Sequence, residues 1–117
     1  MTRPLFSRLL LVMALLAPLA SHSAPVAAGG AAQALHRLLD SEWEWRLQEF
    51  PERATALGDH RYDDRSTDRS PAAIAARRAH HADRLKAIRA IDRKALTGED
   101  RISWDIFEFT SALAVEG

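Results

Sequence analysis

The segment from Ser41 to Asp64, SEWEWRLQEFPERATALGDHRYDD, limits the folds open to this chain more than any other. Helical spacing of apolar residues runs from about Ala34 to Glu49 and stops there, because Pro51 disfavours helical geometry in the residue before it. Pro51 then suits the first turn of a short helix, PERATAL, and Gly58 is typical of the left-handed residue that ends one. The segment therefore predicts two successive helices followed by a polar loop.

Two longer helices are predicted after this loop. Ser70 followed by Pro71 combines an N-cap with proline in the first turn, which predicts a helix over about Pro71–Ile91. Thr97 to Asp100 resembles a capping box with Asp in place of Glu or Gln, and it predicts a last helix with no stop signal before Gly117. No segment shows a convincing strand pattern. The fold class we expect is all-α.

The N-terminal segment has the order of a secretory signal peptide. Arg3 and Arg8 precede an apolar run, Leu9–Ala20, and small residues follow it. The run has about 12 residues, whereas a helix needs about 20 to span a bilayer, so an uncleaved anchor is the weaker interpretation. We predict a signal peptide over residues 1–24, with cleavage between 20 and 28, and a linker over 25–33. The protein is then periplasmic or secreted, with no stable membrane anchor after cleavage.

The composition excludes several kinds of site. The 16 basic and 16 acidic residues balance, so the chain lacks the electrostatic footprint of a nucleic-acid-binding protein. It has no cysteine, which excludes disulfides, thiolate metal sites and a cysteine nucleophile. An exported protein without disulfides needs a large core, a metal or a partner for its stability.

Apolar side chains lie on two sides of two predicted helices. In the first helix, Trp43 and Trp45 are two positions apart and must point in widely different directions. In the last helix, one apolar stripe consists of Ile102, Ile106, Phe109 and Leu113. A second apolar group lies on roughly the opposite side and consists of Trp104, Phe107 and Val115. A surface helix of a small bundle needs only one apolar stripe.

We therefore expect residues 34–117 to be a partial N-terminal helical region of a larger protein, with the rest of the parent polypeptide as its partner. The alternative is a complete small exported helical module that binds a partner and has no enzymatic activity. A fragment is expected to leave Trp45, Trp104 and Phe107 partly exposed, whereas a complete domain is expected to bury them.

Within the apolar arc of the first helix, Glu42 and Arg46 are four residues apart and can pair on one face, with Glu49 three residues beyond. One interpretation is a charged patch between tryptophans that faces a substrate cleft or another domain. The other, which we favour, is a salt-bridge network between helices.

The loop after Gly58 is the only place where imidazole, guanidinium, phenol and carboxylates converge: Asp59, His60, Arg61, Tyr62, Asp63 and Asp64. The spacing matches neither an EF-hand loop nor a zinc helix. An acid/base site on His60 would need a nucleophile or cleft that the sequence does not show. We favour a structural or substrate-lining loop, fixed by Asx-type turns and a network of His, Arg and Asp side chains.

His80 and His81 lie on the predicted helix over 71–91. Adjacent helical residues diverge by about 100°, so the two imidazoles do not readily bind one ion. His81 falls on the apolar stripe and is expected to be a packed, hydrogen-bonded residue, while His80 points aside. The sequence shows no catalytic, cofactor-binding or metal-binding residues of its own.

The residues do carry a family resemblance. The chain from Leu35 to Phe109 resembles the N-terminal region of the DUF885 proteins, most specifically in Phe50-Pro51, in ATALGDHRYDD (54–64) and in DRISWDIF (100–107). These are large, mainly helical bacterial proteins, often exported, grouped with zinc metallopeptidases of the gluzincin type.

The resemblance implies a helical, peptidase-like architecture and a zinc ion in the full-length parent. The family's zinc site uses a His-Glu-x-x-Pro-Gly-His helix and a later Glu-Gly-Trp-Ala-like segment, and neither occurs in these 117 residues. No zinc ligand or general base is therefore carried over to this chain. We expect this chain alone to be inactive, to bind no cofactor, and to contribute helices that wall the peptide cleft of its parent.

Overall fold

The computed structural model describes residues 28–117, and this part of the chain is all-α, as the sequence predicts. Its elements are α1 (Ala28–Glu49), α2 (Pro51–Ala56), α3 (Pro71–Arg89), the 3₁₀ helix η1 (Arg93–Ala95) and α4 (Gly98–Glu116). The predicted signal peptide over 1–24 lies outside the described residues. None of the helices in residues 28–117 is both long enough and apolar enough to cross a membrane.

α1 begins earlier than the sequence indicates. The helix starts at Ala28, six residues before the expected Ala34, so the predicted linker over 25–33 is wrong from residue 28 onward. Alanine has the highest helix propensity, and Ala31 and Ala32 pack against the core of the molecule. These contacts stabilise a turn that local glycine content alone would disfavour.

α2 ends in a Schellman motif, and Gly58 has the predicted role. Its φ of 87° is in the left-handed region. The Gly58 amide donates to the Thr55 carbonyl at 2.9 Å, and the Asp59 amide donates to the Ala54 carbonyl at 2.9 Å. The chain therefore leaves α2 in a fixed direction, and the polar loop starts from a defined position.

The two ends of α3 follow local signals closely. Ser70 is the N-cap, and its hydroxyl accepts a hydrogen bond from the Ala73 amide at 3.2 Å. The helix ends at Arg89, two residues before the predicted Ile91, and Asp92 then caps η1 through the Lys94 amide at 2.9 Å.

The predicted capping box at the start of α4 does not form. Thr97 is the N-cap residue, but its side chain makes no capping hydrogen bond. Asp100, the other half of the expected box, accepts a hydrogen bond from His36 Nε2 of α1 at 2.7 Å. A contact between two helices therefore replaces the local one.

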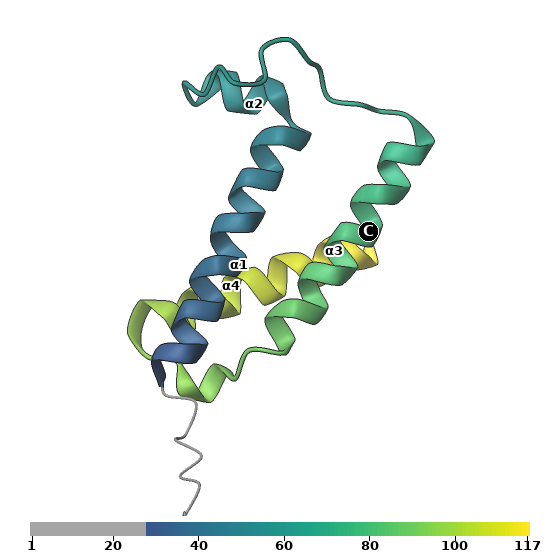
Figure 1. Cartoon of the computed structure of the whole chain (residues 1–117). Coiled ribbons are helices and arrows are strands. Elements are labelled where there is room, and N and C mark those ends of the chain that lie inside the picture. Colours follow the sequence, from purple (N-terminus) through teal and green to yellow (C-terminus); the bar gives the residue numbers. More distant parts are fainter. Residues whose placement is uncertain (1–27) are drawn as a thin grey trace, which may run out of the picture.

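α3 and α4 form a hairpin through η1, and α1 crosses this hairpin near its closed end (Figure 1). A small core lies at the crossing and consists of Leu35, Leu38, Ile88, Leu96 and Phe107. Trp104 closes the hairpin, because its indole Nε1 donates to the carbonyls of Ile88 and Ile91 at 3.0 and 3.2 Å. Away from the crossing, α1 and α3 diverge toward the end of the molecule that carries α2 (Figure 1).

The exposure of the apolar side chains agrees in part with a fragment of a larger protein and in part with a complete small module. Trp45 and Trp104 are half-buried, as a fragment predicts, but Phe107 is only 8% exposed. The outward face of α4 is instead the opposite stripe, with Ile102, Ile106, Phe109 and Leu113 each more than half exposed. Trp43 on α1 is also 52% exposed.

Candidate functional site

A buried carboxylate lies between α1 and α3. Glu42 is 5% exposed, and its Oε1 accepts a hydrogen bond from Arg46 Nε at 2.8 Å, which confirms the pair expected from their spacing. Its Oε2 lies 2.7 Å from Nε2 of His80 on α3. Both carboxylate oxygens are thus engaged, so Glu42 joins two helices in the way the network interpretation requires.

Aromatic rings pack around Trp45, and one of them is the His80 imidazole that binds this carboxylate. The Trp45 indole stacks on the His80 imidazole with 3.6 Å between ring centroids and 9° between planes. His81 meets the same indole edge-on at 5.7 Å, and Phe50 meets it edge-on at 6.2 Å. The prediction that His80 points aside is therefore wrong: His80, and not His81, is hydrogen-bonded across the interface. Burial lowers the pKa of His81, which keeps that ring neutral to lower pH.

Arg77 of α3 extends the contact between these helices. Arg77 Nη1 donates to Glu49 Oε1 at 2.5 Å, so Glu49 pairs with α3 and not with its neighbours on α1. Arg77 Nη2 also donates to the carbonyl of Asp68 at 2.8 Å, which fastens the loop before α3. Side chains with paired charges therefore fill the region where the α1 and α3 backbones diverge.

The loop after Gly58 is anchored to α1 by a residue that the sequence analysis does not single out. Arg61 Nη1 and Nη2 each donate to one oxygen of Glu44 at 3.0 Å, and the Tyr62 hydroxyl donates to Glu44 as well. The Asp59 carboxylate accepts a hydrogen bond from Nη2 of Arg61 at 2.6 Å and another from the backbone amide of Arg61 at 3.1 Å. The second bond is the Asx-type turn predicted for this loop.

The remaining loop residues form a second, smaller group. Asp63 accepts a hydrogen bond from the Thr55 hydroxyl at 2.5 Å, and its other oxygen lies 2.8 Å from His60 Nδ1. Asp64 points to solvent with 82% of its side chain exposed. The expected His, Arg and Asp network is thus present, although Asp64 contributes little to it.

Hydrogen bonds hold the loop carboxylates in their charged form. Bonds from Arg61, with help from Tyr62, lower the pKa of Glu44 to about 2. The pKa of Asp59 is lowered chiefly by Arg61, and that of Asp63 chiefly by the Thr55 hydroxyl. The bond to Glu44 raises the pKa of Tyr62. Groups fixed in this way suit a structural anchor better than a proton relay near neutral pH.

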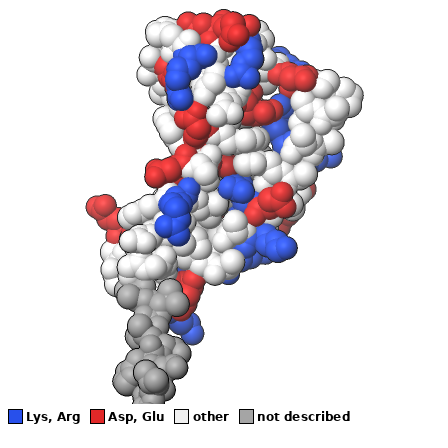
Figure 2. Space-filling model, in the orientation of Figure 1, with Lys and Arg blue, Asp and Glu red and all other residues white. Residues whose placement is uncertain are grey.

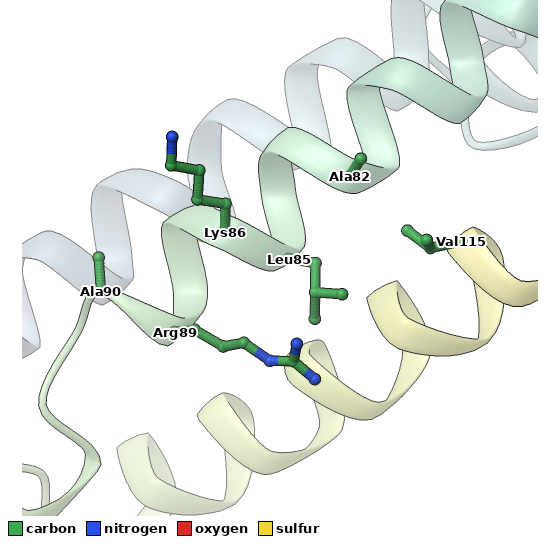
Figure 3. Close-up of a pocket in the computed structure, with 6 residues that line it drawn as sticks. All are labelled: Ala82, Leu85, Lys86, Arg89, Ala90 and Val115. Carbon is green, nitrogen blue, oxygen red and sulfur yellow. The ribbon is translucent and has the colours of Figure 1, made fainter.

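An open groove of about 500 Å³ lies elsewhere, along the α3–α4 hairpin. In Figure 3, Leu85 and the Arg89 guanidinium point from α3 toward α4, and Val115 faces them from α4. Arg89 is already paired with Glu108 at 2.6 Å. None of the predicted site residues lines this groove. On the face shown in Figure 2, charges of both signs alternate, with no large field of one sign.

One comparison with known proteins identifies the family. A family model described as "Bacterial protein of unknown function (DUF885)" matches residues 51–117, which is more than half of the chain. This chain belongs to the DUF885 family. Comparison with curated proteins gave no match, and comparison with solved structures gave none either.

The DUF885 match includes the whole loop from Asp59 to Asp64 together with α3 and α4. It begins after α1, so Glu42, Glu44 and Arg46 precede the matched segment. The resemblance seen in the sequence runs from Leu35 to Phe109. It therefore starts before the first matched residue, 51, and stops before the last matched residue, 117.

The described residues of this DUF885 chain do not fit the zinc ion that the resemblance implies. Among residues 28–117, no group of three or more His, Asp or Glu side chains is placed to hold a metal ion. His36, His60 and His80 each hydrogen-bond a single carboxylate, on Asp100, Asp63 and Glu42 respectively. We therefore derive no chemical step through a metal from these residues.

Proposed function

We propose that this DUF885 chain is the N-terminal helical part of an exported zinc-dependent peptidase or related hydrolase whose metal site lies in another segment of the parent polypeptide. The observation that carries the proposal is the family membership over residues 51–117. The peptide-hydrolysing activity comes from the resemblance of DUF885 proteins to gluzincin-type metallopeptidases. In the parent, zinc would polarise the scissile carbonyl and activate water.

The polar clusters support a scaffolding role for this part of the protein. The Glu42 carboxylate is hydrogen-bonded to Arg46 and His80. The Glu44 carboxylate is hydrogen-bonded to Arg61 and Tyr62. Side chains bound in this way fix the angle between α1 and α3 and the position of the loop. We propose that these elements form one wall of the peptide cleft in the parent.

The apolar faces supply the second argument. α4 buries Phe107 against the core, yet its opposite side exposes Ile106 and Phe109 at 59% and 61%. The largest exposed apolar patch of a soluble protein is often an interaction surface. A helix with two apolar faces is expected where protein lies on both sides of it.

The competing function is a self-contained exported module that binds a partner without enzymatic activity. The burial of Phe107 favours this alternative, since a complete domain is expected to cover that side chain. The two functions make opposite predictions for hydrolysis by a longer gene product.

The test is a comparison of peptide hydrolysis by three proteins: this chain, the longest product of its gene, and that product without residues 28–117. We expect no hydrolysis of a mixed peptide library by this chain alone. The longer product is expected to cleave peptides, to lose activity with a chelator and to regain it with zinc. The deletion is expected to lose activity or solubility. Chelator-insensitive cleavage by the 117-residue chain alone would refute the proposal.

A further inference from the structure

The exposed stripe on α4 has a symmetrical spacing. Ile102, Ile106, Phe109 and Leu113 are separated by four, three and four residues, and they are 59%, 59%, 61% and 53% exposed. This is the alternation of a coiled-coil seam, and it reads the same from either end of the helix. At about 100° per residue, the stripe lies opposite the buried Phe107 and Ser111. An outward face of this kind can meet a copy of itself.

We propose that the 117-residue chain forms a homodimer in which two α4 helices pack antiparallel through this stripe. A two-fold axis beside the midpoint between Ile106 and Phe109 places Ile106 against the partner subunit's Phe109. The same axis places Ile102 against the partner subunit's Leu113. Each apolar residue then meets an apolar residue, as an isologous interface requires.

The positions beside the stripe permit this approach. On the two flanks, Ser103 lies opposite the partner subunit's Thr110, and Asp105 lies opposite the partner subunit's Ala112. No like charges therefore meet beside the four apolar layers. The 4–3 spacing continues to Glu99 at one end and Glu116 at the other, and the antiparallel register brings Glu99 toward the partner subunit's Glu116. These two carboxylate pairs limit the seam to four apolar layers.

The exposed area agrees with what a dimer of ordinary size needs. Four large side chains that are more than half exposed present an apolar area of the order of 400 Å². Since protein interfaces are about 60% apolar, this patch corresponds to an interface of roughly 700 Å² per subunit. Stable complexes bury about 800 Å² per partner, so the stripe offers an area slightly below that of a standard interface.

Sedimentation equilibrium on the exported chain tests this dimer. Intact mass spectrometry first determines the mass of the processed chain. We expect the mass to rise from one chain to two as the concentration passes from about 1 to 200 µM. Phe109→Glu is expected to leave a monomer over this whole range. Ile74→Glu is the matched control, because Ile74 is an exposed apolar residue of α3 outside the stripe, and it should dimerise normally. Circular dichroism should show equal helix content in all three proteins.

A charge exchange tests the antiparallel register. Glu116→Lys and Glu99→Lys are each expected to tighten the dimer about 3- to 10-fold, because each replaces two carboxylate repulsions with two ion pairs. The double variant, Glu99→Lys with Glu116→Lys, should return to the affinity of the native chain. Additive tightening in the double variant would overturn the antiparallel register.

A native chain that stays monomeric up to 200 µM would overturn the dimer itself, as would dimerisation that Phe109→Glu does not weaken. This inference concerns the 117-residue chain, in which the stripe is exposed and free to meet a second copy, and it does not depend on hydrolase activity in a parent protein. The two proposals can fail separately, because one is read from mass and the other from zinc-dependent cleavage.

Discussion

Replacing Glu42 with alanine tests whether the carboxylate between α1 and α3 holds these helices together. Glu42 is 5% exposed and bonded to Arg46 and His80 at 2.8 and 2.7 Å. A hydrogen bond to a charged group contributes about 1.5–3 kcal/mol, and breaking a buried pair costs about 3–5 kcal/mol. Arg46 is 43% exposed and can bind water after the substitution, which reduces this cost. We expect Glu42→Ala to destabilise the α1–α3 contact by about 2–3 kcal/mol.

Amide hydrogen exchange followed by mass spectrometry measures this local effect directly. A loss of 2–3 kcal/mol corresponds to exchange that is about 30- to 150-fold faster. We expect the acceleration in peptides covering residues 41–49 and 77–84, where the two helices contact each other. The core at the α1 crossing, around Leu35 and Leu96, should change much less.

Glu108→Ala is the matched control, because Glu108 makes an ion pair with the 56% exposed Arg89. Exposed pairs contribute about 0.2–1 kcal/mol, so exchange near residue 108 should rise by no more than about fivefold. Acceleration below about threefold around residues 41–49 in Glu42→Ala would refute the reasoning. It would mean that apolar packing at the crossing, and not the carboxylate, sets the angle between α1 and α3.

Three further predictions concern the loop, the end of α2 and the hairpin. Glu44 has its pKa lowered to about 2, so the anchor should be complete above the ordinary Glu pKa of 4.5 and weaken as the pH falls toward 2. Carboxyl NMR should show this midpoint, and it should return toward 4.5 in Arg61→Ala; a native midpoint already near 4.5 would contradict the anchor. Gly58→Ala puts a side chain at φ 87° and should destabilise α2 by about 1 kcal/mol, read as faster exchange over 51–57. Unchanged exchange there would exclude strain at this position. Trp104→Phe leaves the Ile88 carbonyl without its indole donor and should destabilise the α3–α4 hairpin by about 1–2 kcal/mol, measured by urea denaturation. Equal midpoints for the two proteins would show that the indole bonds contribute nothing.

Local signals predicted most of the helical architecture. Ser70, Pro71 and Gly58 act through their own backbone geometry and near neighbours, so their roles are visible in sequence. The early start of α1 is different, because Ala31 and Ala32 near that start pack against a core formed by residues far along the chain. The capping box failed for the same reason, since Asp100 binds His36 of another helix.

The site was predictable where its contacts are local. The Glu42–Arg46 pair and the Asx turn at Asp59 span four residues or fewer, and both were expected. Glu44 was missed because its partners Arg61 and Tyr62 are 17 and 18 residues away, and only the reversal of the chain at α2 brings them together.

His80 and His81 show the limit of helical periodicity. Spacing places His81 on the apolar stripe, but it cannot show that the diverging α1 brings Glu42 and Trp45 to His80. The choice of outward face on α4 has the same origin. Two apolar stripes were visible in the sequence, and the position of α3 and α1 decided that Phe107 is the covered side.

The sequence of the coding DNA beyond codon 117 tests the central claim most directly, namely that this DUF885 chain is part of a larger metal-dependent hydrolase. We predict a continuation, in frame or displaced by a frameshift, that encodes a His-Glu-x-x-Pro-Gly-His segment. A stop codon followed by unrelated sequence would contradict the account and leave the small exported binding module as the function of this chain.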